Sequence, residues 1–170
     1  MSILYNKSIL VTGGTGSIGT ALVEKAIKDK AKLIRIFSND ENGLYEMESQ
    51  YVNHKNIEYV IGDIQNEEIV SEIVKHIDIV FHAAALKHVD RCESNPVEAI
   101  NVNIIGTKNI AKSSVNSNVK KFILISTDKA VNPIGVMGAT KLLGEKLISA
   151  KSSKSQSTIF ASVRFGNVFH

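Results

Sequence analysis

The sequence has one cysteine, two prolines and no tryptophan among its 170 residues. With Cys92 alone, no internal disulfide can form, and this is typical of proteins that fold in a reducing compartment. Two prolines exclude a proline-rich linker protein. We therefore expect a cytoplasmic protein that depends on its hydrophobic core rather than on covalent cross-links.

The sequence also has little net charge and no long apolar run. The 20 Lys and Arg residues nearly balance the 17 Asp and Glu residues, so the net charge is +3 and is spread along the chain. This excludes the concentrated basic surface of a nucleic-acid-binding protein. No apolar run approaches the ~18 residues of a membrane span, and the first residues lack a signal-peptide pattern. We expect neither a nucleic-acid partner nor a membrane segment in this chain.

The sequence does contain short apolar runs that alternate with longer amphipathic stretches. Runs rich in Ile, Val and Phe predict strands buried on both faces at 9–11, 33–37, 57–61, 77–81, 122–125 and 159–165. Apolar spacings of three and four predict helices at 18–28, 67–75, 96–116 and 139–151. Strands that alternate with helices form βαβ units, and these wind into a parallel sheet.

This order of elements predicts an α/β fold. We expect one Rossmann-like domain over residues 1–170, with a doubly wound parallel sheet and helices on both of its faces. The last apolar run is followed by no closing helix. We therefore expect that a carboxyl-terminal, substrate-binding part is absent from this chain.

Glycines recur directly after the first predicted strand, in the pattern Gly13-x-x-Gly16-x-x-Gly19. The first allows a tight turn, the second lets the backbone approach a diphosphate, and the third lets the following helix pack closely on the sheet. The anion would then lie on the amides of the helix N-terminus. A purely structural glycine turn is the alternative, but the strand before and the helix after favour a dinucleotide site. The contacts predicted here are Gly13, Thr15, Gly16, Ser17, Ile18 and Gly19.

The second predicted strand ends in the polar residues Ser38, Asn39 and Asp40, where dinucleotide-binding folds contact the adenosine ribose. Asn39 or Asp40 could bind both ribose hydroxyls of NAD, whereas Ser38 and Asn39 could accept the 2′-phosphate of NADP. No arginine follows the strand to pair with that phosphate, which slightly favours NAD. Asp63, followed by Ile64, ends the third strand, where it could contact adenine, cap the next helix, or do both.

Small and ionisable residues end the fourth and fifth predicted strands, at the edge where α/β folds bind ligands. Asp128 and Lys129 could act as acid and base if their environment brings their pKa values toward neutrality. The alternative for this pair is a surface salt bridge with a helix cap. Lys141, at the start of a later helix, could reach the nicotinamide ribose. Room for that ribose would be left by Ala83, Ala84 and Ala85.

Six segments of the sequence form a specific combination: 12–19, 82–88, 95–99, 126–133, 137–141 and 163–168. In these segments the chain resembles extended short-chain dehydrogenases/reductases, specifically the polysaccharide-biosynthesis UDP-N-acetylglucosamine 4,6-dehydratases, over essentially its whole length. The resemblance implies an NAD(P)-dependent lyase that makes a UDP-4-keto-6-deoxy hexosamine for polysaccharide or glycan biosynthesis. Its cofactor takes a hydride from sugar C4 and returns it to C6 after water has left.

By position, the resemblance implies roles for five residues. Lys129 would abstract the C5 proton, and Asp128 would protonate the departing C6 hydroxyl. Thr127 would hydrogen-bond the C4 oxygen, and Lys141 would hold the nicotinamide ribose. Met137 stands where the wider superfamily has tyrosine, and one branch of these dehydratases shares this Met. A thioether cannot accept the C4 hydroxyl proton, so our candidate for that base is Asp128, relayed through Thr127.

The resemblance also implies contacts outside this centre. Lys87 would face the active site or the substrate phosphates, or else is simply an exposed lysine. Arg164 and Asn167 would contact the UDP-sugar, and Asn103 would be a structural asparagine. Relatives associate through their helices, so we expect a homo-oligomer.

Two other functions stay open at this point. A nucleotide-sugar 4-epimerase would use a 4-keto intermediate that rotates, and it would leave Asp128 and Lys129 without an evident task. A non-catalytic dinucleotide-binding protein agrees with Met137 but not with the joint presence of Asp128, Lys129 and Lys141. No metal is expected, because the histidines come with no cysteine or carboxylate cluster. The choice between NAD and NADP, the exact sugar and the C5 stereochemistry also stay open.

Overall fold

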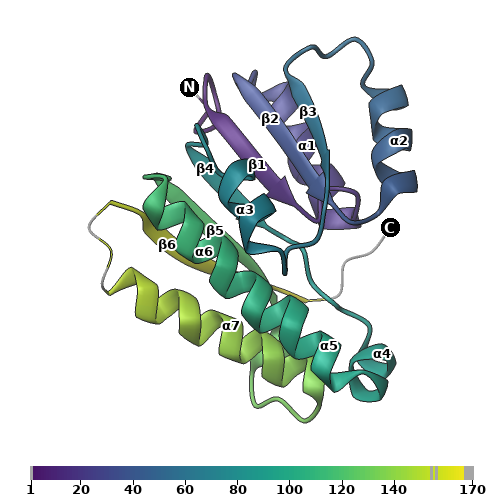
Figure 1. Cartoon of the computed structure of the whole chain (residues 1–170), viewed down its shortest axis with the longest axis vertical. Coiled ribbons are helices and arrows are strands. Elements are labelled where there is room, and N and C mark those ends of the chain that lie inside the picture. Colours follow the sequence, from purple (N-terminus) through teal and green to yellow (C-terminus); the bar gives the residue numbers. More distant parts are fainter. Residues whose placement is uncertain (1, 154, 156, 167–170) are drawn as a thin grey trace.

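The computed structural model describes residues 2–153, 155 and 157–166. Its centre is a parallel six-stranded sheet in the order β3-β2-β1-β4-β5-β6 (Figure 1). The strands are β1 Ser8–Thr12, β2 Leu33–Ser38, β3 Ile57–Ile61, β4 Ile79–His82, β5 Lys121–Thr127 and β6 Ile159–Phe165. The predicted Rossmann-like α/β fold is confirmed.

Helices cover both faces of this sheet. They are α1 Ser17–Lys28, α2 Glu41–Gln50, α3 Glu67–Ile73, α4 Val89–Ser94, α5 Pro96–Ile100, α6 Thr107–Asn116 and α7 Val136–Ser152. A π-helical turn, η1 Asn101–Gly106, joins α5 to α6, and a 3₁₀ turn, η2 Asp128–Ala130, follows β5. Figure 1 shows α1 and α2 on one face and α3, α6 and α7 on the other. In the part of the chain that the structure describes, no helix is long and apolar enough to cross a membrane.

The core has two layers because successive strand side chains point to opposite faces of the sheet. In β1, Leu10 packs with Phe122 in the cluster on the α3 and α6 side. The preceding residue, Ile9, packs with Val23 of α1 in the cluster on the opposite side. Continuous apolar runs, rather than alternating ones, are therefore the pattern that this sheet requires.

Two helices escaped the sequence prediction. The helix α2 buries only Leu44 and Met47, and α4 buries only Cys92. Their remaining positions are partly or fully exposed, so the apolar spacing that reveals a helix is weak in both. The predicted helix at 96–116 is a continuous helical stretch, with the π-turn at its centre.

The order of the strands reverses between β1 and β4. From β1 the chain runs outward through β2 and β3, and it then returns to β4 on the other side of β1. Thr12 and His82, the last residues of β1 and β4, are neighbours in this register. In open α/β sheets, ligands bind in the crevice at the carboxyl ends of strands where the order reverses.

Candidate functional site

The turn after β1 has a backbone that only glycine accepts readily. Gly13 has φ +66°, and its amide donates to the Phe37 carbonyl of β2 at 2.7 Å. A β-carbon at Gly13 would come within 2.7 Å of the Ala84 backbone nitrogen. The turn therefore lies directly against the segment that follows β4, and α1 begins at its far end.

The start of α1 has the form of an anion site. Gly16 is the N-cap residue, with no side chain to satisfy the helix amides, and no acidic residue lies in the first turn. If Gly16 carried a β-carbon, the nearest described atom outside its chain neighbours would be the Gly13 carbonyl oxygen, at 3.4 Å. Space beside Gly16 is thus left open, and the helix dipole favours an anion there.

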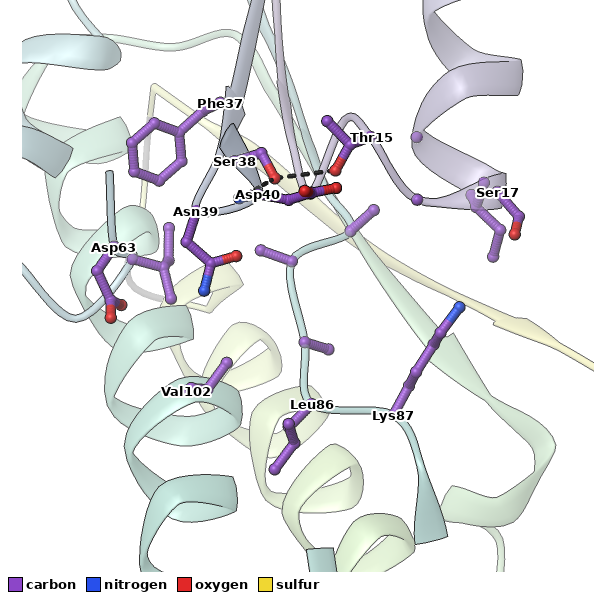
Figure 2. A pocket seen from close by; sticks show the side chains of 18 of the residues that line it. Thr15, Ser17, Phe37, Ser38, Asn39, Asp40, Asp63, Leu86, Lys87 and Val102 are labelled. Carbon is purple, nitrogen blue, oxygen red and sulfur yellow. Dashed lines mark hydrogen bonds between the residues drawn. The ribbon is translucent and has the colours of Figure 1, made fainter. Parts of the chain in front are cut away.

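A pocket of about 530 Å³ occupies the crevice at this edge of the sheet (Figure 2). It brings together every residue of the predicted dinucleotide site except Lys141, and it also includes Lys87. These lining residues are Gly13, Thr15, Gly16, Ser17, Ile18, Gly19, Ser38, Asn39, Asp40, Asp63, Ile64, Ala83, Ala84, Ala85 and Lys87. Sequence reasoning missed Phe37, Gly62, Leu86, Glu98, Val102 and Gly166.

Some of the missed residues could have been found from the sequence. Phe37 lies in β2 just before the predicted Ser38, and Gly62 directly follows β3. Their places at carboxyl ends of strands were a usable signal. Glu98 and Val102 come from α5 and η1, which reach the pocket only through the tertiary fold.

Polar side chains at the ends of β2 and β3 are organised by local hydrogen bonds. Ser38 and Thr15 join their hydroxyls at 2.9 Å, and Asp40 caps α2 by accepting from the Gly43 amide at 3.0 Å. Asp63 does not cap α3, contrary to one of its two predicted roles. It accepts from the Gln65 amide at 2.8 Å.

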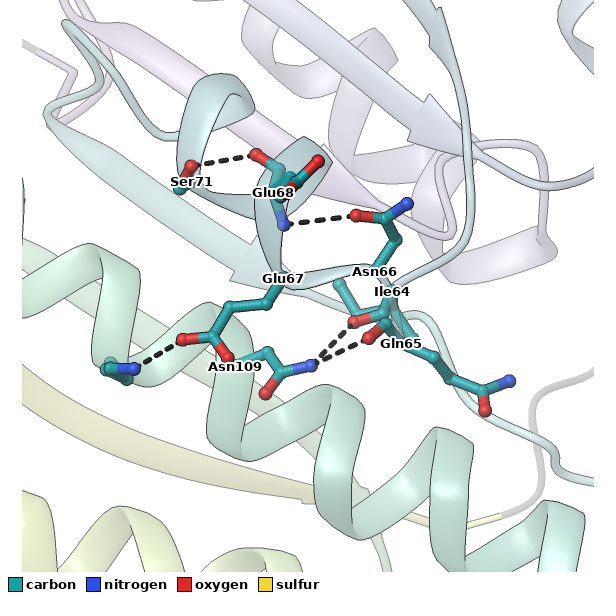
Figure 3. Close-up of polar contacts among 8 residues, drawn as sticks. Ile64, Gln65, Asn66, Glu67, Glu68, Ser71 and Asn109 are labelled. Atoms are coloured by element: carbon teal, nitrogen blue, oxygen red, sulfur yellow. Dashed lines mark hydrogen bonds and ion pairs between the residues drawn. The ribbon is translucent and has the colours of Figure 1, made fainter.

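The N-cap of α3 is Asn66, which accepts from the amide of Glu68 (Figure 3) and also from the amide of Ile69. From α6, the amide side chain of Asn109 donates to the carbonyl of Gln65 at 3.0 Å (Figure 3). The turn after β3 is therefore fixed by Asp63, Asn66 and Asn109 together, and Asp63 also lines the pocket.

The predicted catalytic tripeptide lies at the end of β5. Thr127 donates to an oxygen of Asp128 at 3.0 Å, and the Lys129 amine lies 3.6 Å from the same oxygen. Both charged side chains are about half exposed, and none of the three residues lines the pocket. The hydrogen bond from Thr127 holds the pKa of Asp128 below its usual value, with help from the charge of Lys129.

Lys141 and Met137 lie inside the protein, on α7. The Lys141 amine donates to the Ile125 carbonyl of β5 at 2.6 Å, and burial lowers the pKa of Lys141 to about 8. Met137 packs with Cys92 and Ala99 in a small apolar cluster. Neither residue lines the pocket.

Of the remaining predicted contacts, the structure describes Arg164, which does not line the pocket. Arg164, on β6, forms a two-pronged ion pair with Glu145 of α7, at 2.9 and 2.6 Å. Its guanidinium is therefore bound to the protein rather than directed at an open site. Ser126 donates to the same Glu145 carboxylate at 2.5 Å. Asn167 lies outside the described residues.

A buried histidine at the end of β4 should make stability depend on pH. Burial, and secondarily the charge of Lys141, lower the pKa of His82 to about 3. An unfolded histidine has a pKa of about 6.5. Below that pH the unfolded chain binds a proton that the folded chain excludes, so stability falls as pH falls.

We expect the free energy of unfolding to decrease between pH 7 and pH 5, by roughly 1 kcal/mol per pH unit from this group. Urea unfolding at several pH values measures the slope. His82→Gln should flatten it, while substitution of the exposed His54 should not. Equal slopes in His82→Gln and the parent would contradict the assignment.

Comparison with known proteins identifies the family that this chain matches. The sequence model described as "Polysaccharide biosynthesis protein" matches residues 9–170. An uncharacterized membrane protein of Methanocaldococcus jannaschii is 50% identical over 167 residues, which are 97% of this chain and 50% of that protein. A UDP-glucose 4-epimerase of Rickettsia typhi is 43% identical over 172 residues, covering 98% and 50% respectively. The chain spans about half the length of the curated relatives that it matches.

Solved structures show the same architecture. Pen from Bacillus thuringiensis is 40% identical with a TM-score of 0.95, over 99% of this chain and 53% of that one. WbmF of Bordetella bronchiseptica, solved in complex with NAD+, is 18% identical with a TM-score of 0.85, over 99% and 52%. The latter shares the fold. The relative named as a 4-epimerase is matched over only half of its length, so its name does not decide between an epimerase and a dehydratase for this chain.

Proposed function

The chain belongs to the polysaccharide biosynthesis protein family, and we propose that it forms the dinucleotide-binding half of a nucleotide-sugar 4,6-dehydratase. The proposed substrate is UDP-N-acetylglucosamine, and the product is a UDP-4-keto-6-deoxy hexosamine. The observation that carries the proposal is the hydrogen-bonded cluster of Thr127, Asp128 and Lys129. It ends β5, the neighbour of the strand that leads into the pocket wall. The proposed acid–base pair and the proposed dinucleotide site would thus share one edge of the sheet.

NAD is the proposed cofactor of the pocket. The turn from Gly13 to Gly19 would hold the diphosphate, and Ser38, Asn39 and Asp40 would hold the adenosine ribose. Asp63 and Ile64 would border the adenine, and the alanines after β4 would border the nicotinamide ribose. To hold that ribose, Lys141 would have to exchange the Ile125 carbonyl for it. When bound, the cofactor accepts a hydride from sugar C4 and returns it to C6. The NAD+ held by WbmF, a protein of this fold, agrees with the fit.

In the proposed cycle the residues at the end of β5 move protons. Asp128 takes the C4 hydroxyl proton through Thr127, and Lys129 takes the proton from C5. Asp128 then gives its proton to the C6 hydroxyl, which leaves as water. Lys129 finally returns a proton to C5. The cycle starts from an ionised Asp128 and a neutral Lys129 amine, so Lys129 must first release its ammonium proton to solvent. Each residue then ends in its starting state.

The observed hydrogen bonds support this order of steps. The Thr127 hydroxyl donates to Asp128, so its oxygen can accept from a sugar hydroxyl and complete a relay. The lowered pKa of Asp128 favours the ionised form that the first step requires. Asp128 then acts as an acid only while it holds the C4 proton, which removes the need for a raised pKa. Met137 has no part in these transfers.

Lys87 and Arg164, with Asn167, are the proposed contacts of the nucleotide sugar. Lys87 lines the pocket and could meet a phosphate there. Arg164 would have to exchange Glu145 for the substrate or act by orienting Glu145. A homo-oligomer also remains a proposal.

Incubation with UDP-N-acetylglucosamine and NAD+ tests the proposed reaction. The measurement is made on the complete polypeptide that contains this sequence, with products separated and weighed by mass spectrometry. A product lighter by one water, with C6 reduced and C4 oxidised, supports the dehydratase. UDP-N-acetylgalactosamine of unchanged mass would overturn it in favour of a 4-epimerase. Bound NAD+ with no conversion of the sugar would instead indicate a non-catalytic role.

The residues at the end of β2 predict a preference for NAD+ over NADP+. The Asp40 carboxylate borders the pocket, and Lys87, from the segment after β4, is the one basic side chain in the described lining. A 2′-phosphate near Asp40 would meet like charge without a compensating cation. We expect NAD+ to bind at least about tenfold more tightly, a difference of about 1.4 kcal/mol.

The variant Asp40→Asn tests this preference, because Asn is an equally good N-cap and only the charge is removed. In titration calorimetry, the ratio of the NAD+ affinity to the NADP+ affinity should be smaller for Asp40→Asn than for the parent. It should stay unchanged in Asp63→Asn, which removes a charge elsewhere in the pocket. Equal affinities of the parent for NAD+ and NADP+ would show that Asp40 does not select the cofactor.

A further inference from the structure

A chain of buried hydrogen bonds joins the end of β1 to the π-turn through the ring of His82. Thr12 and His82 are fully buried, and the Thr12 hydroxyl lies 2.7 Å from His82 Nδ1. On the other side of the ring, His82 Nε2 lies 2.9 Å from the Thr107 hydroxyl. The Thr107 hydroxyl in turn donates to the Asn103 carbonyl at 2.7 Å.

The direction of these bonds fixes the state of the ring. Because the Thr107 proton goes to Asn103, its oxygen must accept from His82 Nε2, which therefore carries a proton. On the other side, the Thr12 oxygen accepts from the Ala84 amide at 3.3 Å. The Thr12 proton is then available for His82 Nδ1, which is the acceptor. All the bonds run in one direction around a neutral imidazole.

Both ends of this chain hold the same wall of the pocket. At one end, the Ala83 amide donates to the Thr12 carbonyl at 3.0 Å, beside the Gly13 turn. At the other end, the Asn103 side chain accepts from the Leu86 amide at 2.8 Å and donates to the Leu86 carbonyl at 3.0 Å. The segment 83–86 is thus fixed at its beginning and at its end by partners that meet at His82.

We propose that His82 is a positioning residue of the dinucleotide site. Its neutral, Nε2-protonated ring sets the spacing between the phosphate-binding turn, the wall 83–86 and the π-turn. The inference rests on the proposed dinucleotide binding and goes beyond it, since His82 itself does not line the pocket. A histidine that merely fills the core would contribute to stability alone. A positioning residue must also change cofactor affinity in protein that remains folded.

The ring state is tested on the unliganded protein by long-range ¹H–¹⁵N NMR of the histidines. We expect His82 to show a protonated Nε2 and an unprotonated Nδ1, unchanged from pH 8 to pH 5. The exposed His54 and His76 give reference signals in the same spectrum. A protonated Nδ1 on His82, in either the neutral or the charged ring, would overturn the proposal.

The positioning role is tested with the matched pair Thr107→Val and Thr107→Ser. Valine keeps the shape of threonine and removes the hydroxyl, whereas serine restores it. We expect Thr107→Val to weaken NAD+ binding at least about fivefold, and Thr107→Ser to stay within about twofold of the parent. Affinity is measured by calorimetry at a temperature where circular dichroism shows each variant folded.

The outcomes separate the two claims. If the parent binds NAD+ and Thr107→Val binds it equally well, the positioning role is wrong and the proposed function stands. If the parent binds no NAD+, the proposed function fails and the positioning role fails with it. Should Thr107→Val not fold, the matched pair Thr12→Val and Thr12→Ser replaces it at the other end of the hydrogen-bond chain. Parent-like NAD+ affinity of a folded Thr12→Val would likewise refute the role.

Discussion

Replacing Gly16 by alanine should weaken NAD+ binding about 10- to 100-fold while leaving the fold intact. Gly16 has φ −76° and ψ 165°, a conformation that alanine adopts without strain. Its added β-carbon would meet the protein no closer than 3.4 Å, an ordinary contact. The same carbon would occupy space beside the first turn of α1, where the diphosphate is proposed to lie. Overpacking by one methyl group costs about 1–3 kcal/mol, which gives the expected range.

The control for this variant is Ser149→Ala. Ser149 is an exposed residue of α7 and does not line the pocket. Alanine slightly favours a helix over serine, so thermal stability should stay the same or rise a little, and NAD+ affinity should stay unchanged. Calorimetry and thermal melts on both variants measure the two quantities separately. Parent-like affinity of Gly16→Ala would show that the diphosphate does not bind at this turn.

The fold could be predicted from the sequence because its signals are local. Strands buried on both faces appear as continuous apolar runs, and β3 and β6 have the predicted bounds. The rule that crossovers are right-handed and short restricts the possible orders of strands, but it does not choose among them. The helix α2 was missed because tertiary contacts at Leu44 and Met47, rather than a full apolar stripe, hold it in place.

The dinucleotide pocket could be predicted for the same reason, since strand ends and a glycine pattern mark it in the chain. The surroundings of the reactive groups could not. Arg164 of β6 pairs with Glu145 of α7, which is 19 residues earlier in the sequence, and Lys141 donates to a carbonyl of β5. The network through His82 unites residues from β1, β4 and α6, and no sequence spacing reveals such a meeting.

The proposed catalytic cluster of Thr127, Asp128 and Lys129 gives the largest expected effect. Replacing Lys129 by alanine should lower the rate of 4-keto-6-deoxy sugar formation by about 10²–10⁴, the contribution of one positioned acid–base group. Alanine removes the only group proposed to take the C5 proton, and water cannot leave from C6 until that proton is taken. NAD+ binding should be unchanged, because Lys129 does not line the pocket.

A measurement of hydride transfer distinguishes the loss of the C5 base from a general loss of activity. In Lys129→Ala, Asp128 and Thr127 can still accept the C4 proton, so the first oxidation should proceed and absorbance at 340 nm should rise and persist after sugar is added. The matched control is Lys120→Ala, an exposed lysine just before the opposite end of β5, which should react like the parent. A Lys129→Ala protein that forms product at the parent rate would show that another group takes the C5 proton. If Lys129→Ala gives neither the 340 nm signal nor product, Lys129 acts in the first step instead. Removal of the C5 proton follows the oxidation at C4 and so cannot affect it.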